Sequence, residues 1–432
     1  MGTTNARGCL VMRSMKQILL TALFALLLLT PARAQLQFSD SLRISLLTCT
    51  AGPDAYERFG HAGIRIKDLK QESLDVTFHY GVFSFDAPHF VYRFVKGETD
   101  YMLGALPTLY FVEEYRERGL GMTEQTLRLD SAQAQQLTER LLINYRPENR
   151  TYRYSYFFDN CSTRPYHLLN AATNNVISYD SAWVNAISLR QMVQECTGLG
   201  NWLNFGIALA VAGRADRQTT YEEQLFLPGY LSKAVDHATI PINVGDETVQ
   251  LPLVTDSQTL LTMRDDVAQA IAAPDPIAPR TVLGALLMIG AVLMAMVSWK
   301  RRANARSAGR WEIALRSYDT LWLTAVALTG CIVWFLNFFS LHPAVDHNLN
   351  CLWLLPTHLI AAGLIWVKRC QKVCSYYFGI TFALVIVYVV ADWITGQYCP
   401  PEFLLLLATI LLRSFGLMQP LTKRPNDKNN IN

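Results

Sequence analysis

The sequence predicts an α+β domain followed by an α-helical membrane domain of about five transmembrane helices. Up to about Pro279, short segments with alternating apolar and polar residues are mixed with segments of helical periodicity. Beyond that residue the chain is dominated by long apolar runs, and 51% of the 432 residues are hydrophobic while only 17% are charged. The proline-rich stretch Ala272–Pro279 separates the two parts and is typical of a linker.

The charge pattern gives no sign of a nucleic-acid partner. The formal net charge is only +3, and the basic residues gather in short segments beside the apolar runs. The sequence contains no basic stripe with interleaved aromatic residues, which is the pattern that nucleic-acid binding would require.

The first 34 residues have the pattern of a secretory signal peptide. Lys16 precedes an apolar run from Ile18 to Leu29, and Ala32 and Ala34 supply the small residues of a cleavage site. The apolar run is short for a membrane span. An uncleaved anchor helix is the alternative. In either case residues 35–271 are predicted to form an exported domain.

The first part of this domain is predicted to be rich in β-strands. The alternation predicts a hairpin with His61 at the start of one strand and His79 near the end of the next. The alternating segments are Leu42–Thr48, Ile64–Lys67, Asp75–Tyr80, Gly81–Asp86 and Phe90–Phe94.

The second part of the domain is predicted to be largely helical. Asp130 or Ser131 supplies an N-cap for the first of these helices. The predicted helices are Ser131–Asn144, Thr163–Asn170, Leu189–Glu195, Trp202–Val211 and Glu222–Leu231, the last broken at Pro228. Short strands are expected to return within Ile242–Thr255.

Five apolar runs follow a linker at 272–280. They are approximately Val282–Trp299, Leu321–Phe339, Leu352–Val367, Tyr377–Ala391 and Phe403–Leu417. If the first span runs from outside to inside, all the basic segments fall on the cytoplasmic side, as basic loops prefer. We therefore expect a transmembrane domain over 281–420 and a cytoplasmic tail over 421–432.

Cys161 is the candidate nucleophile. Asp159, Asn160 and Ser162 are good N-cap residues, and Pro165 suits a first helical turn. Cys161 is therefore expected at or just before the N-terminus of a helix. Unpaired N–H groups and the helix dipole favour a thiolate at such a position.

His61 is the candidate base for this thiol. A cysteine at a helix start and a histidine on a neighbouring strand, oriented by a third polar group, form the arrangement used for thiol acyl transfer. The structural alternative is that Cys161 is a small buried apolar residue and His61 a hydrogen-bonded turn residue. A disulfide between Cys49 and Cys196 is a further open alternative, since spacing does not establish pairing.

The same residues carry a resemblance to known families. The segment Phe59–His61 followed by a hairpin, with Asp159–Thr163 downstream, resembles the circularly permuted papain-like fold of the NlpC/P60 type. Nearly all of the mature chain is similar to a bacterial membrane-bound family, the Lnb-type lipoprotein N-acyltransferases. The shared stretches include Leu46–Cys49, His79–Phe85, Asn149–Tyr154, Phe157–Arg164, Trp202–Gly206, Phe226–Pro228, Phe338–Pro343 and Asn348–Asn350.

This resemblance implies an acyltransferase of the bacterial inner membrane with its catalytic domain in the periplasm. Cys161 would take an acyl chain from a phospholipid as a thioester. The α-amine of the diacylglyceryl-modified N-terminal cysteine of a lipoprotein would then accept the chain, in a ping-pong sequence. His61 would be the base and His79 its orienting partner. No cofactor and no metal are implied.

Further residues are expected to support this site or its substrates. The backbone N–H of Cys161 is the expected oxyanion donor. The side chains expected to stabilise the oxyanion or to support the site are Asn160, Asp159 and Tyr80. Those expected to contact lipid or headgroups are Trp202, His342, Asn348 and Asn350.

Two other functions stay open at this point. The first is a cell-wall amidase or peptidase, because NlpC/P60 proteins include enzymes that cut peptidoglycan. The second is a non-enzymatic membrane scaffold in which Cys161 is structural. An exchange of Cys161 for alanine separates the enzymes from the scaffold.

Overall fold

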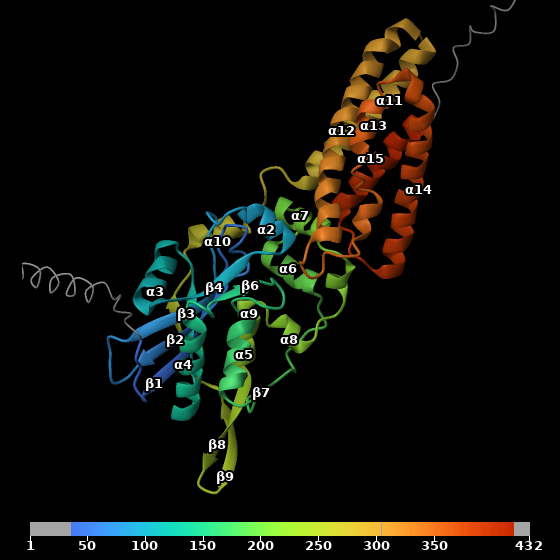
Figure 1. Ribbon diagram of the computed structural model, residues 1–432. Helices are drawn as coiled ribbons and strands as arrows, with labels where there is room; N and C mark the ends of the chain where they lie inside the picture. Colours follow the sequence, from blue (N-terminus) through green and yellow to red (C-terminus); the bar gives the residue numbers. More distant parts are fainter. Residues whose placement is uncertain (1–35, 304, 419–432) are drawn as a thin grey trace, which may run out of the picture. The chain divides into compact units, whose positions relative to one another are not determined.

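A seven-stranded antiparallel sheet forms the centre of the first part of the chain (Figure 1). The computed structural model describes residues 36–303 and 305–418, so the predicted signal peptide and the predicted tail lie outside the described residues. In sheet order the strands are β10 (Val254–Leu261), β5 (Met122–Leu127), β1 (Leu42–Cys49), β2 (His61–Asp68), β3 (Asp75–Val82), β4 (Asp100–Pro107) and β6 (Thr151–Arg153).

Helices cover both faces of this sheet. Because side chains alternate along a strand, Leu47 of β1 packs with Phe111 and Val267 on one face, and Leu46 packs toward Leu137 on the other. The helices on the first face are α3 (Thr108–Glu117) and α10 (Asp265–Ala272), and those on the second are α4 (Ser131–Tyr145), α5 (Thr163–Ala172) and α9 (Pro228–Asp236).

The remaining elements of this part lie between α5 and β10 in the chain. They are β7 (Ser178–Tyr179), α6 (Leu189–Thr197), α7 (Trp202–Ala210), η1 (Gly213–Asp216), α8 (Tyr221–Gln224), β8 (Ala238–Val244) and β9 (Glu247–Pro252). Strands β7, β8 and β9 form a second, three-stranded sheet. The break expected at Pro228 is present, because α8 ends at Gln224 and α9 begins at that proline.

The hairpin predicted around His61 and His79 is present as β2 and β3. Its register pairs Ile64 with Phe78 and Lys67 with Asp75. His61 is the first residue of β2, and His79 lies near the end of β3, as the alternation predicts.

One predicted strand is wrong: Phe90–Phe94 belongs to the helix α2 (Phe90–Lys96). Gly97 ends this helix in the left-handed conformation, with φ of 74°, and its N–H returns to the carbonyls of Arg93 and Phe94. None of the seven residues of α2 is fully buried. The alternation of large apolar residues therefore reflects an exposed helix and not a pleated strand.

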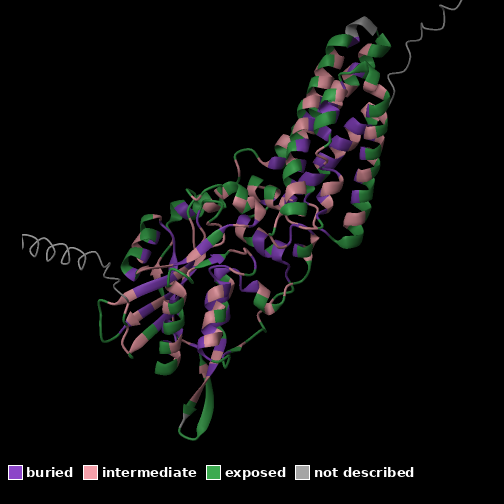
Figure 2. Cartoon of the chain, viewed as in Figure 1, coloured by how far each residue is buried: buried purple, intermediate pink, exposed green. Residues whose placement is uncertain are grey.

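Four helices among the described residues are long and apolar enough to cross a membrane. They are α11 (Pro279–Ala303), α12 (Ala305–Phe339), α14 (Gln371–Thr395) and α15 (Pro401–Met418). Much of the surface of these helices is exposed (Figure 2). The exposed residues include large apolar side chains, such as Ile380 and Trp393 of α14. Apolar side chains that face away from a helix bundle are what lipid contact requires.

The third predicted span, Leu352–Val367, is not one continuous helix. The chain forms three short helices here, η2 (Leu349–Leu352), α13 (His358–Leu364) and η3 (Lys368–Cys370). Pro356 lacks an N–H group and disfavours a helical residue before it, so a helix cannot run through this point without a break.

The broken segment still crosses the bundle. At one end, the N–H of Leu349 donates to Gln397 Oε1, just beyond the C-terminal end of α14. At the other end, η3 leads directly into the first residue of α14. The two ends of the segment therefore lie at opposite ends of α14. This corrects the prediction of a continuous third helix but keeps a fifth passage of the chain.

Candidate functional site

A tight loop between β6 and α5 presents Cys161. Asn160, which is buried, holds this loop through its side chain. Its Oδ1 accepts from the backbone N–H groups of Ser162 and Thr163 at 2.8 and 3.0 Å, and its Nδ2 donates to the carbonyls of Tyr156 and Phe226, both at 2.8 Å. Both amide protons of Asn160 are therefore used. Asn160 positions Cys161 and has no proton left to stabilise an oxyanion.

His61 and Cys161 meet beside Gly81. A Cβ atom placed on Gly81 would lie 3.7 Å from Cys161 Cβ and 3.8 Å from His61 Cε1. Gly81 has a φ of +95°, a conformation that favours glycine, so the backbone calls for a residue without a side chain here. The structure thus brings together two residues that are 100 positions apart in the sequence.

His79 completes the arrangement on the far side of His61. The Nε2 atom of His61 and the Nδ1 atom of His79 are 3.0 Å apart. A Cβ atom on Gly104 would come within 2.9 Å of His79 Nε2, so this glycine makes room for the second imidazole. The ring of Phe111 packs against both imidazoles, with ring centroids 6.4 Å and 5.2 Å away.

Burial keeps the thiol of Cys161 and the imidazoles of His61 and His79 uncharged. Desolvation lowers the pKa of His61 to about 3, with smaller contributions from His79 and Arg118, and lowers the pKa of His79 to about 4. Desolvation also raises the pKa of the Cys161 thiol to about 11, although the backbone N–H groups of Ala62 and Cys161 oppose this rise. The expectation of a preformed thiolate is therefore not met, because burial outweighs the local effect of the helix start.

The lowered pKa values of His61 and His79 predict acid sensitivity of the fold. In the unfolded chain each imidazole binds a proton as pH falls below about 6.5, whereas the folded protein resists protonation until about pH 4 or below. Stability should therefore fall between pH 6.5 and 4. His79→Asn should make that fall shallower, as measured by denaturant unfolding in detergent. If the stability of the variant falls with pH as steeply as that of the wild type, His79 is not a source of the acid sensitivity.

Arg164, to which no role is assigned from the sequence, organises the other side of the loop. Its Nε and Nη2 atoms bond the carboxylate of Asp159 at 2.5 and 2.8 Å. Its guanidinium carbon lies 3.5 Å from the ring centroid of Tyr152 and 5.4 Å from that of Tyr80. Tyr80 in turn accepts a hydrogen bond from Asn144. Asp159 and Tyr80 thus hold the scaffold around Cys161 through Arg164.

The cysteine thiols leave Cys161 free for chemistry. Cys49, Cys161 and Cys196 are all unpaired. The disulfide between Cys49 and Cys196, left open by the sequence, is absent from the structure. The backbone N–H of Cys161 donates to no other residue in the part of the chain that the structure describes, so it is free to act as an oxyanion donor.

Comparison with known families covers both parts of the chain. Residues 33–194 match the Lnb N-terminal periplasmic domain, and residues 272–424 match the Lnb transmembrane domain. The chain belongs to the Lnb family. No curated protein and no solved structure matches it. The first match contains His61 and Cys161, and the second begins where the proline-rich linker begins.

Family membership confirms a membrane protein with a periplasmic domain. The Lnb periplasmic domain holds the Cys161 site, and the Lnb transmembrane domain holds α11 to α15. The permuted papain-like character of the periplasmic domain stays a prediction.

Two residues of the Lnb transmembrane domain that were expected at a lipid headgroup are used within the protein. Asn348 and Asn350 are buried, and their side-chain amides donate to the last carbonyls of α7, those of Ala208, Leu209 and Ala210. Unpaired carbonyls at a helix C-terminus need such donors. These amides fasten α7 to the bundle and are not free to bind a headgroup.

Trp202 and His342 also make internal contacts. Trp202 is half exposed at the start of α7, and its Nε1–H donates to the carbonyl of Ile277 in the linker. His342 Nε2 lies 2.6 Å from the carbonyl oxygen of Phe94 in α2. Trp202 thus holds the linker, and His342 holds α2.

The helix α2 lies where α12 ends. Besides His342, the N–H of Leu341 donates to the carbonyl of Lys96, and the hydroxyl of Ser340 donates to that of Val95. The rings of Tyr92 in α2 and Phe335 in α12 have centroids 6.1 Å apart. Because α12 is a membrane-spanning candidate that ends at Phe339, these contacts place α2 beside the end of a candidate membrane span.

Apolar side chains are exposed along α2 and the loop before it. Val91 is 73% exposed and Tyr92 is 55% exposed, which is unusual for a contiguous apolar set. We call this set, together with Tyr56 from the loop between β1 and β2, the aromatic ridge. It consists of Tyr56, Phe85, Val91, Tyr92 and Phe94, and the ring of Tyr56 contacts that of Phe85. Phe83, two residues after Gly81, connects the ridge to the site. The ring of Phe83 contacts the rings of Tyr56, Phe85 and Phe90.

Proposed function

We propose that this protein is a lipoprotein N-acyltransferase that carries an acyl chain from a phospholipid, through a thioester on Cys161, to the α-amine of the lipid-modified N-terminal cysteine of a lipoprotein. The observation that carries this proposal is the juxtaposition of two features. The Cys161–His61 pair lies beside Gly81, and the aromatic ridge, which Phe83 contacts, is held at the end of a candidate membrane helix.

A site at the membrane surface suits these substrates. Moving an acyl chain out of a bilayer costs about 0.8 kcal/mol per methylene group. An enzyme that held its nucleophile far from the membrane would have to meet that cost for both donor and acceptor. The aromatic ridge instead offers an apolar surface over which an acyl chain reaches Cys161 without full exposure to water.

The first half of the reaction uses a neutral thiol and a neutral imidazole. Nε2 of His61 is engaged with His79, so Nδ1 is the atom left to take the proton from Cys161 Sγ. The sulfur then attacks the ester carbonyl carbon of the phospholipid, and the developing oxyanion is stabilised by the N–H of Cys161. The C–O bond breaks, His61 returns the proton to the leaving oxygen, and a lysophospholipid departs.

The second half runs the same groups in reverse. The α-amine of the acceptor attacks the thioester carbon and loses a proton to His61. The C–S bond breaks, the proton returns to Cys161 Sγ, and an amide is formed. His79 holds the ring of His61 in place through both halves, since the 3.0 Å contact between them fixes its orientation.

Mass spectrometry of lipoprotein N-termini tests this function. In cells that lack the protein, we expect the N-terminal residue of lipoproteins to be a diacylglyceryl cysteine with a free α-amine. Wild-type protein should restore the N-acylated form. If N-acylated lipoproteins persist in the deletion strain while peptidoglycan cross-links change, the protein acts as a cell-wall amidase instead.

The aromatic ridge gives a separate prediction. Changing Val91 and Tyr92 together to serine should slow acyl transfer from phospholipid vesicles by about tenfold, because about 1.4 kcal/mol of apolar contact with the bilayer is lost. Both side chains are exposed, and the hydrogen bonds that hold α2 to residues 340–342 use backbone carbonyls of α2, so folding should be little affected. The measurement is the initial transfer rate from vesicles, compared with the rate from a short-chain, water-soluble donor.

A matched control is Val249→Ser, which removes an exposed valine from β9. Its transfer rate from vesicles should equal that of the wild type. Equal losses with the vesicle and the soluble donor in the Val91/Tyr92 variant would show that the ridge shapes the site and does not bind the membrane.

A further inference from the structure

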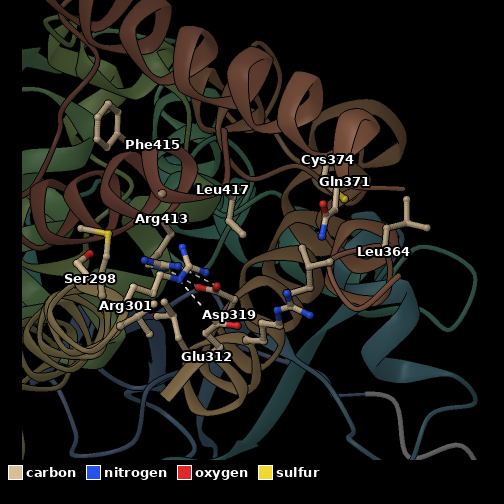
Figure 3. A pocket seen from close by; sticks show the side chains of 16 residues that line it. Ser298, Arg301, Glu312, Asp319, Leu364, Gln371, Cys374, Arg413, Phe415 and Leu417 are labelled. Atoms are coloured by element: carbon tan, nitrogen blue, oxygen red, sulfur yellow. Dashed lines mark hydrogen bonds and ion pairs between the residues drawn. The ribbon is translucent and has the colours of Figure 1, made fainter. Parts of the chain in front are cut away.

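A cavity of about 350 Å³ opens between the helices of the bundle (Figure 3). It lies between the end of α11, the first half of α12, the start of α14 and the end of α15. The opposite ends of these helices adjoin the periplasmic domain, where Asn348 bonds α7. Because that domain is periplasmic, the cavity lies at the cytoplasmic side of the membrane.

Charged side chains line this cavity in an unbalanced set. Arg413 bonds Asp319 through two atoms at 2.6 and 2.9 Å, and Arg301 bonds Glu312 at 2.8 Å. The third arginine, Arg316, has no ion-pair partner among the described residues. Three arginines face two carboxylates, so one positive charge is left unmatched.

Arg413 also has an unused donor that faces the cavity. Its side chain is 4% exposed, and its Nη1 atom is buried without a hydrogen-bond partner in the described part of the chain. A Cβ atom on Gly416, which lines the cavity, would lie 3.3 Å from Nη1, so this donor lies beside the cavity wall where glycine leaves space. A buried guanidinium nitrogen without a partner carries a substantial free-energy cost, which an anionic ligand would offset.

We propose that this cavity binds the phosphate group of an anionic phospholipid of the inner leaflet. The phosphate accepts a hydrogen bond from Arg413 Nη1 and lies near Arg316. Its negative charge balances the unmatched positive charge of the three arginines. The cavity volume falls within the range of about 300–1,000 Å³ found for small-ligand sites. Basic pockets between transmembrane helices at the cytoplasmic side suit anionic headgroups.

The apolar part of the lining favours a lipid over a free phosphate ion. Met294, Phe415 and Leu417 line the same cavity as the arginines. A phospholipid satisfies both kinds of surface, with its phosphate at the guanidinium groups and its glycerol and first methylenes against the apolar side chains. This site is separate from the acyl donor site, because it lies at the other end of the bundle from Cys161.

Binding to the purified, delipidated full-length protein in an uncharged detergent tests the proposal. We expect phosphatidylglycerol to bind saturably and to raise the midpoint of thermal unfolding, and phosphatidylcholine and inorganic phosphate to have much weaker effects. Arg316→Gln should weaken phosphatidylglycerol binding about fivefold, as expected for one basic side chain near a membrane surface. Arg316 forms no ion pair within residues 36–303 and 305–418, so this variant should fold.

The matched control is Arg310→Gln, which removes an exposed arginine from the same helix outside the cavity. It should bind phosphatidylglycerol as the wild type does. Equal weakening by the Arg310 and Arg316 exchanges would overturn the proposal, because general surface charge would then explain binding. Binding of inorganic phosphate or phosphatidylcholine as tight as that of phosphatidylglycerol would overturn it as well.

Discussion

Cys161→Ala should abolish acyl transfer while leaving the protein folded. The variant lacks the sulfur on which the acyl group is carried, so the loss should be on the order of 10³-fold or more. The side chain is small and buried, and alanine fills most of its volume, so the thermal midpoint should change little. The measurement is the rate at which a diacylated lipopeptide becomes N-acylated in vesicles.

Cys196→Ala is the matched control for this exchange. Cys196 is also a free thiol of the periplasmic domain, but it lies on α6 and not beside His61. Its transfer rate should stay near that of the wild type. A Cys161→Ala protein that still N-acylates the lipopeptide at a comparable rate would leave the scaffold alternative standing.

His61→Ala should reduce the transfer rate by about 10²- to 10⁴-fold, which is the usual contribution of a positioned general base. The variant should also acquire a new pH dependence. The pKa of the Cys161 thiol is raised to about 11, so without a base the thiolate fraction grows about tenfold with each pH unit below that value. The residual rate should therefore rise steeply between pH 7 and pH 9, whereas the wild-type rate should not.

His167→Ala is the control, because His167 is an exposed histidine on α5, near Cys161 in the sequence. It should retain the wild-type rate and pH profile. A residual rate in His61→Ala that does not depend on pH would show that His61 supports the fold of the loop and does not take the proton of Cys161.

Local sequence patterns predict the strands that carry the site. The alternation in Asp75–Tyr80 is the direct signature of a half-buried strand, and this pattern by itself places His79 on the strand beside His61. The cap residues around Cys161 likewise predict the start of α5. Both features depend on contacts between near neighbours in the chain, which is why they can be read from the sequence.

The predictions that are wrong concern features that depend on contacts between distant residues. Phe90–Phe94 has the alternation of a strand, but the helix that it forms is held by the segment Ser340–His342, more than 240 residues away. The pKa of Cys161 follows the burial created by the whole domain, which outweighs the helix start that the local sequence shows.

In the membrane part, too, local sequence predicts some features, and contacts between distant residues set the others. The apolar run Leu352–Val367 predicts a passage through the bilayer, and the passage is present. Hydropathy does not show how backbone groups are satisfied around Pro356, so it does not reveal the break. Polarity alone also does not show that Asn348 and Asn350 are used to hold α7.

The most direct test is to look for the acyl group on Cys161 itself. Purified protein is incubated with a phospholipid of defined chain length and no acceptor, and its mass is then measured intact and after digestion. We expect one acyl chain on the peptide that contains Cys161, released by neutral hydroxylamine and passed to a diacylated lipopeptide when that is added. Acyl transfer to the lipopeptide by a protein that never carries a hydroxylamine-sensitive chain on Cys161 would contradict the account.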